Sequence, residues 1–310
     1  MATTTKTFTG FYETIWREVV DLSARSKAEE FPQVMRILSS GNHFERFIAW
    51  AGLGLPSTKN ELGPIAFDDP IQLGTKEVTF GTKALGFKCS YEAMEDDKYD
   101  VVSQTASAIG DSIREGREID AAQLWNNVLS GDPTPMLGFD GLSIVNSAHI
   151  SRKPGGITQS NLGTGDIGLG LIESAKYHFR NLRTEQGFRD TGHTIKKIVI
   201  APDATVEPLL MQILGGTGMQ PFTADNTAHE LGATRTSLST FSYTYLTDLD
   251  RTIILSDKAL SQPAGPSWID RRKPSMTSWD DPSIMGSCYA TSYRANIFCG
   301  IWRGIFASGG

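Results

Sequence analysis

The clearest pattern of apolar and polar positions covers residues 97–130 and predicts one long helix. Apolar residues recur there at helical spacing, at Val102, Ala106, Ile109 and Ile113. No proline interrupts the stretch, and residues 131–133 (Gly-Asp-Pro) end it. About 33 helical residues at 1.5 Å each give roughly 50 Å, which is about the diameter of a compact domain of this length. We therefore expect an elongated or flat molecule; the alternative is two helices joined by a kink near Gly116.

Two different stretches precede this helix. An N-terminal helix is predicted by an apolar face that contains Phe11, Ile15, Val19 and Leu22. Its face would suit packing on its own domain and docking on a neighbouring subunit equally well. Residues 52–89 contain too many glycines and prolines for a helix, and residues 76–80 alternate polar and apolar side chains, as in a strand with one covered face. We expect an extended hairpin without a core of its own, which must lie on something else, such as the next subunit.

The remainder of the chain predicts a mixed α/β region followed by closing strands. Strands are predicted at residues 141–145, 197–200 and 252–255, with an alternating stretch at 238–246. Helices are predicted at residues 167–182 and 202–214. Two closing strands are predicted at residues 289–298 and 301–306.

Composition and charge narrow the class of protein. A length of 310 residues suggests about two domains or one large irregular domain. Hydrophobic residues make up 39% and charged residues 21%, as in a soluble folded protein. The net charge of -6 argues against a dedicated nucleic-acid-binding domain, although not against a protein that lies beside nucleic acid. Three cysteines exclude a disulfide scaffold and fit a reducing cytoplasm. With no signal peptide or membrane span visible, we expect a chain that is soluble and intracellular when made.

The sequence offers little chemistry. It contains no nucleophile elbow, phosphate-binding loop or cysteine–histidine metal spacing, so we predict no catalytic, cofactor or metal site. We interpret His149 as a loop histidine that ties down the backbone, and Asp280 and Asp281 as part of a turn. The basic residues 271–273 are interpreted as a solvated turn or salt-bridging patch, with weak contact to packaged DNA as the alternative. An α/β enzyme stays a rival hypothesis that has no recognised constellation to support it.

The order of these parts, together with local sequence, points to a known family. The supporting segments are residues 61–70, 84–87, 92–97, 141–149, 161–162, 198–214, 245–248 and 302–304, with Arg294. An arm, a glycine-rich hairpin, a very long helix, a mixed α/β middle and closing strands resemble the major capsid proteins of tailed bacteriophages. These have the Hong Kong 97-type fold, and the resemblance is closest to the branch with Mu-like major head subunits. It covers roughly residues 8–308.

The resemblance implies a fold and a function. The fold would be α+β, with an N-terminal arm (1–51), an extended β-hairpin loop (52–89), a peripheral domain with the spine helix (90–132), an axial domain (133–266) and a return to the peripheral domain (267–310). The protein would be structural and not an enzyme. It would self-assemble as hexamers and pentamers into an icosahedral shell that encloses double-stranded DNA. The alternative is a nanocompartment shell of the encapsulin type, which has the same fold and encloses proteins.

The same resemblance implies partners and contact residues. The partners would be further copies of the chain, a separate scaffolding protein, a portal, a decoration protein and packaged DNA held by non-specific contact, with no cofactor and no membrane. The protein would reside in the virion capsid after assembly in the host cytoplasm. In the extended loop, contacts with the neighbouring subunit are expected from Asp68, Asp69, Lys76, Glu77, Phe80 and Lys83.

Two features of some family members are not matched. A scaffolding segment fused before the arm has no place, because the arm-like helix begins almost at Met1. We therefore expect a separate scaffolding protein or none. Covalent cross-linking of neighbouring subunits would use Lys76 or Lys83, but no asparagine partner or catalytic acid can be identified for it.

Overall fold

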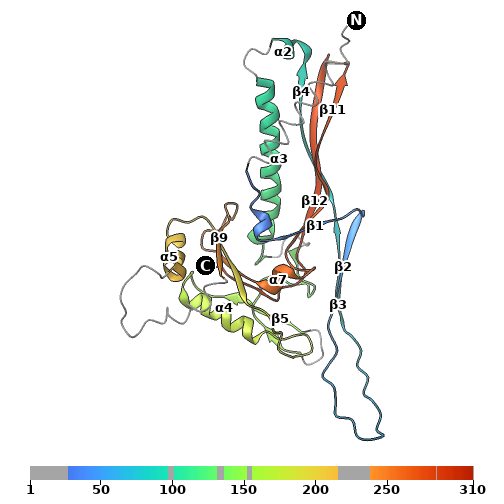
Figure 1. The fold of residues 1–310 in the computed structure, drawn as a ribbon, viewed down its shortest axis with the longest axis vertical. Coiled ribbons are helices and arrows are strands. Elements are labelled where there is room, and N and C mark those ends of the chain that lie inside the picture. The colour runs from blue at the N-terminus through green and yellow to red at the C-terminus, as the bar shows by residue number, and fades with distance from the viewer. Residues whose placement is uncertain are drawn as a thin grey trace.

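The computed structural model describes residues 27–96, 101–130, 136–151, 156–215, 238–283 and 285–309. Figure 1 shows an elongated molecule, in which a helix and long strands follow the long axis, a body lies to one side and a narrow hairpin projects. The elongated shape expected from the helix length is confirmed. The predicted N-terminal helix lies outside the described residues.

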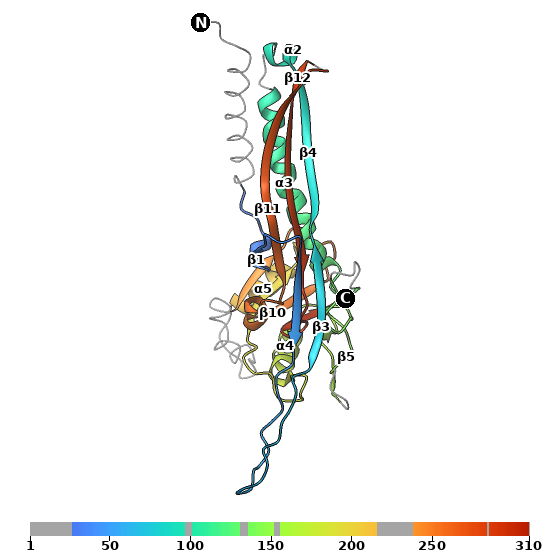
Figure 2. The ribbon, with the colours of Figure 1, turned by 90° about the vertical axis from the view of Figure 1, so that its right-hand side faces the viewer.

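A four-stranded sheet and one helix form the long part of the molecule. The strand order is β1 (Arg36–Ser39), β11 (Ser267–Asp281), β12 (Gly286–Phe298) and β4 (Gly81–Ser90). β12 pairs antiparallel with β4 along the whole length of β4 without a shift in register. The helix α3 (Val101–Asn126) lies along this sheet, as both views show (Figures 1 and 2), and the short α2 (Tyr91–Glu95) precedes it.

The body is built on a five-stranded sheet. Its strand order is β7 (Leu162–Gly163), β13 (Ile305–Ser308), β10 (Thr252–Ser256), β8 (Ile195–Ile200) and β9 (Ser239–Ser242). The body also contains α4 (Leu169–Asn181), α5 (Val206–Gly215), α7 (Asp257–Ser261) and a small hairpin of β5 (His149–Ile150) and β6 (Thr158–Gln159). Phe179 of α4 packs with Ile198 and Ile254 of the sheet in one buried cluster.

The projecting hairpin consists of β2 (Phe44–Trp50) and β3 (Gln72–Thr79), joined by residues 51–71. The 3-10 helix η1 (Phe31–Gln33) and β1 precede it. The expected bounds of 52–89 for this hairpin are wrong at both ends. Its outgoing strand is β2, and residues 81–90 belong to the long sheet because they pair with β12.

Most of the predicted helices and buried strands are confirmed. α3 passes through Gly116 without a break, so the alternative of two kinked helices is wrong. Its 26 residues span about 39 Å, and residues 127–130, which were expected to continue the helix, form a turn. Residues 97–100 of the predicted helix lie outside the described residues. The helices predicted at 167–182 and 202–214 are α4 and α5, and the strands predicted at 197–200, 252–255 and 289–298 are β8, β10 and β12.

Three local predictions are wrong. Residues 271–273, interpreted as a solvated turn or salt-bridging patch, lie inside β11, as does Asp280, while Asp281 ends the strand and accepts from the Ser283 N–H in the turn that follows. Residues 271–281 are exposed or half-buried and lack the period-two apolar pattern of a strand with one buried face. Residues 141–145 form a tight turn, in which Gly141 has a φ of 83° and the N–H of Gly138 donates to the Leu142 carbonyl at 2.8 Å. The last strand begins at Ile305, because the turn at Gly304, with a φ of 86°, precedes it.

Arg117 of α3 is buried and joins three parts of the chain. Its Nε donates to Glu29 Oε1 at 2.7 Å, and its Nη1 donates to Asp270 Oδ1 of β11 at 3.0 Å. Three aromatic rings surround the guanidinium, with centroids 5.1 to 5.9 Å from Cζ: Phe31, Trp268 and Tyr293. Burial opposes the charge, but the two carboxylates raise the pKa of Arg117 above its usual value. The cation is therefore kept inside the core.

The next residue of α3 holds the same N-terminal segment by its backbone. The Glu118 carboxylate accepts hydrogen bonds from the N–H groups of Glu30 and Phe31 and from the Tyr243 hydroxyl, the last at 3.1 Å. Burial raises the pKa of Glu118 despite these donors. Consecutive residues of α3 thus fasten residues 29–31 to the long sheet through Asp270 and to the body through Tyr243.

Removing the buried cation tests this joint. The Arg117→Met variant is expected to lower the free energy of unfolding of the dissociated subunit by about 3–5 kcal/mol, because Asp270 is left as a buried, unpaired carboxylate. Denaturant unfolding measures the loss. Arg272→Met is the control, since Arg272 is exposed on the same strand, and its effect should stay within about 0.5 kcal/mol. Equal losses in both variants would contradict the assignment.

A half-buried histidine makes stability depend on pH. His178 of α4 lies beside Phe306, with ring centroids 5.5 Å apart, and burial, helped by His193 and His149, lowers its pKa from 6.5 to about 4. Between these two values the unfolded chain binds a proton that the folded chain does not, so stability falls as the pH falls. The total loss is about 3 kcal/mol, complete below pH 4. Denaturant unfolding of the dissociated subunit gives the free energy of unfolding between pH 7 and pH 4, and this energy should fall less steeply for His178→Leu than for the wild type. Identical pH dependence of the two proteins would refute the role of His178.

Candidate functional site

The root of the projecting hairpin is fixed to the rest of the molecule by an apolar cluster. Val78 and Phe80 are buried together with Phe139 and Phe298. Phe47 of β2 stacks on Phe298 with ring centroids 4.1 Å apart and an interplanar angle of 13°. The two strands of the root therefore share a core with β12 and cannot swing freely.

Polar contacts reinforce this root. The ammonium of Lys76 on β3 donates to the carbonyl of Leu137, and burial lowers the pKa of Lys76 although Asp140 opposes the shift. Gln186 Nε2 donates to the carbonyl of Gly52 at 2.9 Å. A Cβ atom at Gly74 would lie 3.0 Å from the Phe139 carbonyl oxygen, so the strand approaches the body more closely than most side chains allow.

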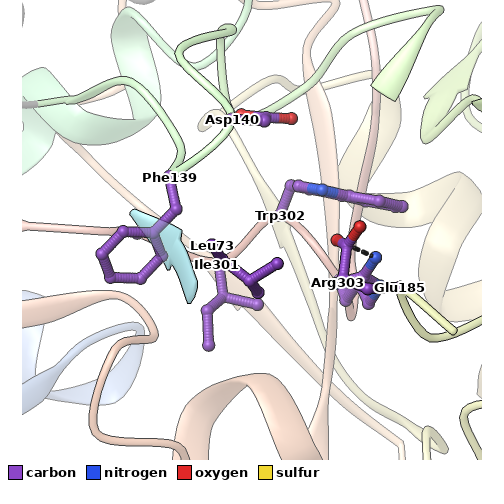
Figure 3. Close-up of a pocket in the computed structure, with 8 residues that line it drawn as sticks. Leu73, Phe139, Asp140, Glu185, Ile301, Trp302 and Arg303 are labelled. Carbon is purple, nitrogen blue, oxygen red and sulfur yellow. Dashed lines mark hydrogen bonds and ion pairs between the residues drawn. The ribbon is translucent and has the colours of Figure 1, made fainter. Parts of the chain in front are cut away.

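A small cavity of about 30 Å³ lies beside the root (Figure 3). Leu73 of β3 lines it together with Asp140, Trp302 and Arg303. Arg303 Nη2 donates to Glu185 Oε1 at 2.6 Å, and its guanidinium carbon lies 4.7 Å from the Trp302 ring centroid. A cavity of this size holds about one water molecule, whereas ligand pockets begin at about 300 Å³. It marks the packing of hairpin on body and is no substrate site.

The distal part of the hairpin exposes apolar side chains. Residues 51–71 carry exposed large apolar residues at Leu53, Leu55, Leu62, Ile65 and Phe67. The outward face of β2 adds Phe44, Ile48 and Trp50. Several large exposed apolar side chains on one projecting segment favour an interaction surface. We call residues 51–71 the hairpin tip, and these eight side chains the apolar surface of the hairpin.

The six residues predicted to contact a neighbouring subunit divide into two groups. Asp68 and Asp69 lie exposed in the hairpin tip, where Asp68 accepts hydrogen bonds from the N–H groups of Gly54 and Asp69. Glu77 is exposed on β3 and forms an ion pair with Arg46 of β2. These three stay candidates for a contact between subunits.

The other three predicted contact residues are bound within their own chain. Phe80 is buried in the root cluster, where its side chain packs inside its own subunit; its expected contact with a neighbouring subunit stays a prediction. Lys76 is half-buried at the root, and Lys83 of β4 forms an ion pair with Asp120 of α3. Lys83 therefore connects the long sheet to the long helix.

Sequence reasoning missed the apolar surface of the hairpin. The signal was available, because large apolar residues inside a glycine- and proline-rich segment have no regular element to bury them. The predicted contact residues were mostly charged residues of the loop. Only the tertiary structure distinguishes the buried root of the hairpin from its exposed tip.

His149, interpreted as a loop histidine that ties down the backbone, lies in β5, and its ring contacts side chains instead. Its ring is buried, its Nε2 lies 3.1 Å from Asn161 Oδ1, and its Nδ1 contacts Asp140 Oδ2. The ring stacks on Trp302 with centroids 4.2 Å apart and an interplanar angle of 5°. Asn161 in turn donates to two backbone carbonyls. His149 thus connects the loop after α3 to the last turn of the body.

Ser256, His193 and Asp190 have the order of a hydrolase triad. Ser256 Oγ lies 3.1 Å from His193 Nδ1, and His193 Nε2 lies 3.2 Å from Asp190 Oδ2. Ser256 is fully buried, however, and its hydroxyl caps α7 by accepting from the Ala259 N–H. Burial alone would raise the pKa of Asp190, but His193 and Lys258 lower it to about 2. No substrate reaches this serine, and the three side chains hold α7 on the sheet.

The remaining acidic residues of interest also have structural roles. Asp280 accepts from the Ser287 hydroxyl at 2.6 Å. Asp281 accepts from the Ser283 hydroxyl at 2.5 Å and from the Ser283 N–H at 3.0 Å, and these two hydrogen bonds lower the pKa of Asp281. In the described part of the chain, no group of three or more histidine, cysteine, aspartate or glutamate side chains could hold a metal ion. No described helix is long and apolar enough to span a membrane.

Comparison with known proteins identifies the fold through shape and not through sequence. The sequence matches no family model and no curated protein. The procapsid of bacteriophage JBD30 superposes with a TM-score of 0.52 at 13% identity, covering 99% of this chain and 76% of that chain. The capsid of the native GTA particle gives 0.57 at 10% identity, over 92% and 89% of the two chains. The mature capsid of bacteriophage PhiM1 gives 0.56 at 10% identity, over 91% and 87%.

Each of these superpositions covers 91% or more of this chain. At such low identity they establish the architecture alone. The α+β class expected from the order of the parts is confirmed, and the chain has the Hong Kong 97-type fold found in capsid proteins of tailed phages.

Proposed function

We propose that this chain is the major capsid protein of a tailed phage, which assembles as hexamers and pentamers into an icosahedral shell around double-stranded DNA. The observation that carries the proposal is the hairpin. Its root shares a core with the rest of the subunit, while its apolar surface projects into solvent. An apolar surface held away from its own subunit is suited to lie on another copy.

The division of the fold suits a shell. We assign α3 and the long sheet to the peripheral domain, the body to the axial domain around the centre of a capsomer, and residues 44–79 to the extended loop. One chain in such a shell must meet several non-identical neighbours under closed symmetry. A rigid body combined with a projecting hairpin meets this requirement, because the tip adjusts while the packed parts stay fixed.

The negative net charge suits a shell that encloses DNA without binding it tightly. The net charge of -6 repels the phosphate backbone, so the proposed contact with packaged DNA is weak and non-specific. The proposed partners of assembly are a separate scaffolding protein, a portal and a decoration protein. A nanocompartment shell of the same fold would enclose proteins, and particle content separates the two functions.

The direct test is assembly. The expressed chain, supplied with its scaffolding protein, is expected to elute in size-exclusion chromatography as capsomers or shells of hundreds of kilodaltons and to show closed particles in negative-stain microscopy. Nuclease-protected DNA in particles from infected cells supports the capsid, whereas protein cargo supports the nanocompartment. A clean monomer under all conditions would refute both.

The hairpin tip provides a second test. Replacing residues 53–69 by an Asn-Gly turn keeps β2, β3 and the hydrogen bond from Ala51 N–H to the Ile71 carbonyl, and it removes most of the exposed apolar side chains. The variant should fold with an unchanged unfolding midpoint and form no shells. If the variant subunit fails to fold, or if it assembles like the wild type, the role of the tip is wrong.

A further inference from the structure

Leu62 at the hairpin tip has an unusual backbone conformation. Its φ is 60°, in the left-handed region, and it occupies the third position of a β-turn closed by the Gly63 N–H and the Asn60 carbonyl at 3.0 Å. A positive φ at this turn position is normally supplied by glycine or asparagine, because a Cβ atom there approaches the backbone closely. A leucine in this place costs free energy that a glycine would not.

Within the described part of the chain, no packing of the Leu62 side chain compensates this cost. The side chain of Leu62 is 100% exposed, so it gains no packing in its own chain. Backbone strain combined with an exposed apolar side chain is unfavourable twice over for an isolated subunit. Strain of this kind is typical of positions where function requires a particular side chain to point outward.

The same combination recurs at the other end of the molecule. Among the described residues, Leu62 and Met285 are the two non-glycine residues with positive φ, and Met285 has a φ of 44° with 63% exposure. Met285 lies in the turn that joins β11 to β12. Trp279, near the end of β11, is also half-exposed. The hairpin tip and this turn lie at opposite ends of the long axis (Figure 1).

From this coincidence we infer that Leu62 and Met285 are the anchor residues of two separate contacts, each placing its side chain in an apolar surface of a second copy of this chain. The inference rests on the proposed function, which supplies the second copy. A tip that fits a different surface of the next copy makes a head-to-tail contact, and such contacts generate rings where the rotation between copies closes. A few buried apolar anchors usually carry most of the energy of an interface. Asp68 and Glu77 would then lie at the rim of the contact made by the hairpin.

Glycine substitution separates the two properties of each anchor. Leu62→Gly removes the backbone strain, because glycine adopts a positive φ without cost, so the dissociated subunit should unfold at a higher temperature. The same substitution removes the apolar side chain, so assembly should become weaker. The protein concentration needed for half-maximal shell formation, followed by light scattering, is expected to rise about tenfold or more. Met285→Gly should have the same two effects, and the two increases should multiply because the contacts are separate.

Two controls make the test specific. Leu62→Met keeps an apolar side chain of similar reach and should assemble at close to the wild-type concentration. Leu249→Gly removes another exposed leucine, one with an ordinary backbone conformation, and should leave assembly unchanged. The inference is overturned if Leu62→Gly and Met285→Gly assemble like the wild type, or if Leu249→Gly weakens assembly as much as they do. If the wild type itself never assembles, the proposed function fails, and that outcome is distinct from a defect confined to the variants.

Discussion

The guanidinium of Arg117 stands where three parts of the chain meet, and the architecture depends on keeping it charged. It lies on the long helix, pairs with Asp270 of the long sheet and with Glu29 of the N-terminal segment, and is enclosed by aromatic rings. A buried ion pair adds little net stability compared with an apolar core, but it strongly disfavours arrangements that leave one partner alone. Helix, sheet and N-terminal segment are therefore held in one mutual arrangement, and the neighbouring Glu118 extends that arrangement to the body.

The root of the hairpin is packed against this rigid part of the subunit. Phe47, Val78 and Phe80 pack the root of the hairpin against Phe139 and Phe298, so the subunit sets the direction in which the hairpin leaves it. The exposed apolar side chains lie on the outward face of β2, opposite Phe47, and continue through residues 51–71. The buried root residues thus orient the hairpin, and the exposed apolar side chains are left free to contact another molecule.

Several buried polar clusters look like catalytic sites and work as architecture. Ser256, His193 and Asp190 hold a short helix on the body sheet, and His149 with Asp140 and Asn161 connects loops that are distant in sequence. In each cluster the polar atoms are paired inside the protein, as buried polar groups must be. A catalytic group needs an approach from solvent, which the fully buried Ser256 does not have. Side chains that have the arrangement of a catalytic site but that substrate cannot reach are structural.

The sequence by itself determined the long helix, the buried strands of the body and the order of parts, because helical spacing and short apolar runs are local signals. It did not determine β11, whose exposed half carries no apolar alternation and is a strand only because β12 and β4 continue the sheet beside it. It also did not distinguish Phe80 from Phe67, two aromatic residues of one glycine-rich region. Phe80 is buried and Phe67 exposed because only the root of the hairpin reaches Phe139 and Phe298, residues far along the chain that tertiary packing brings to it.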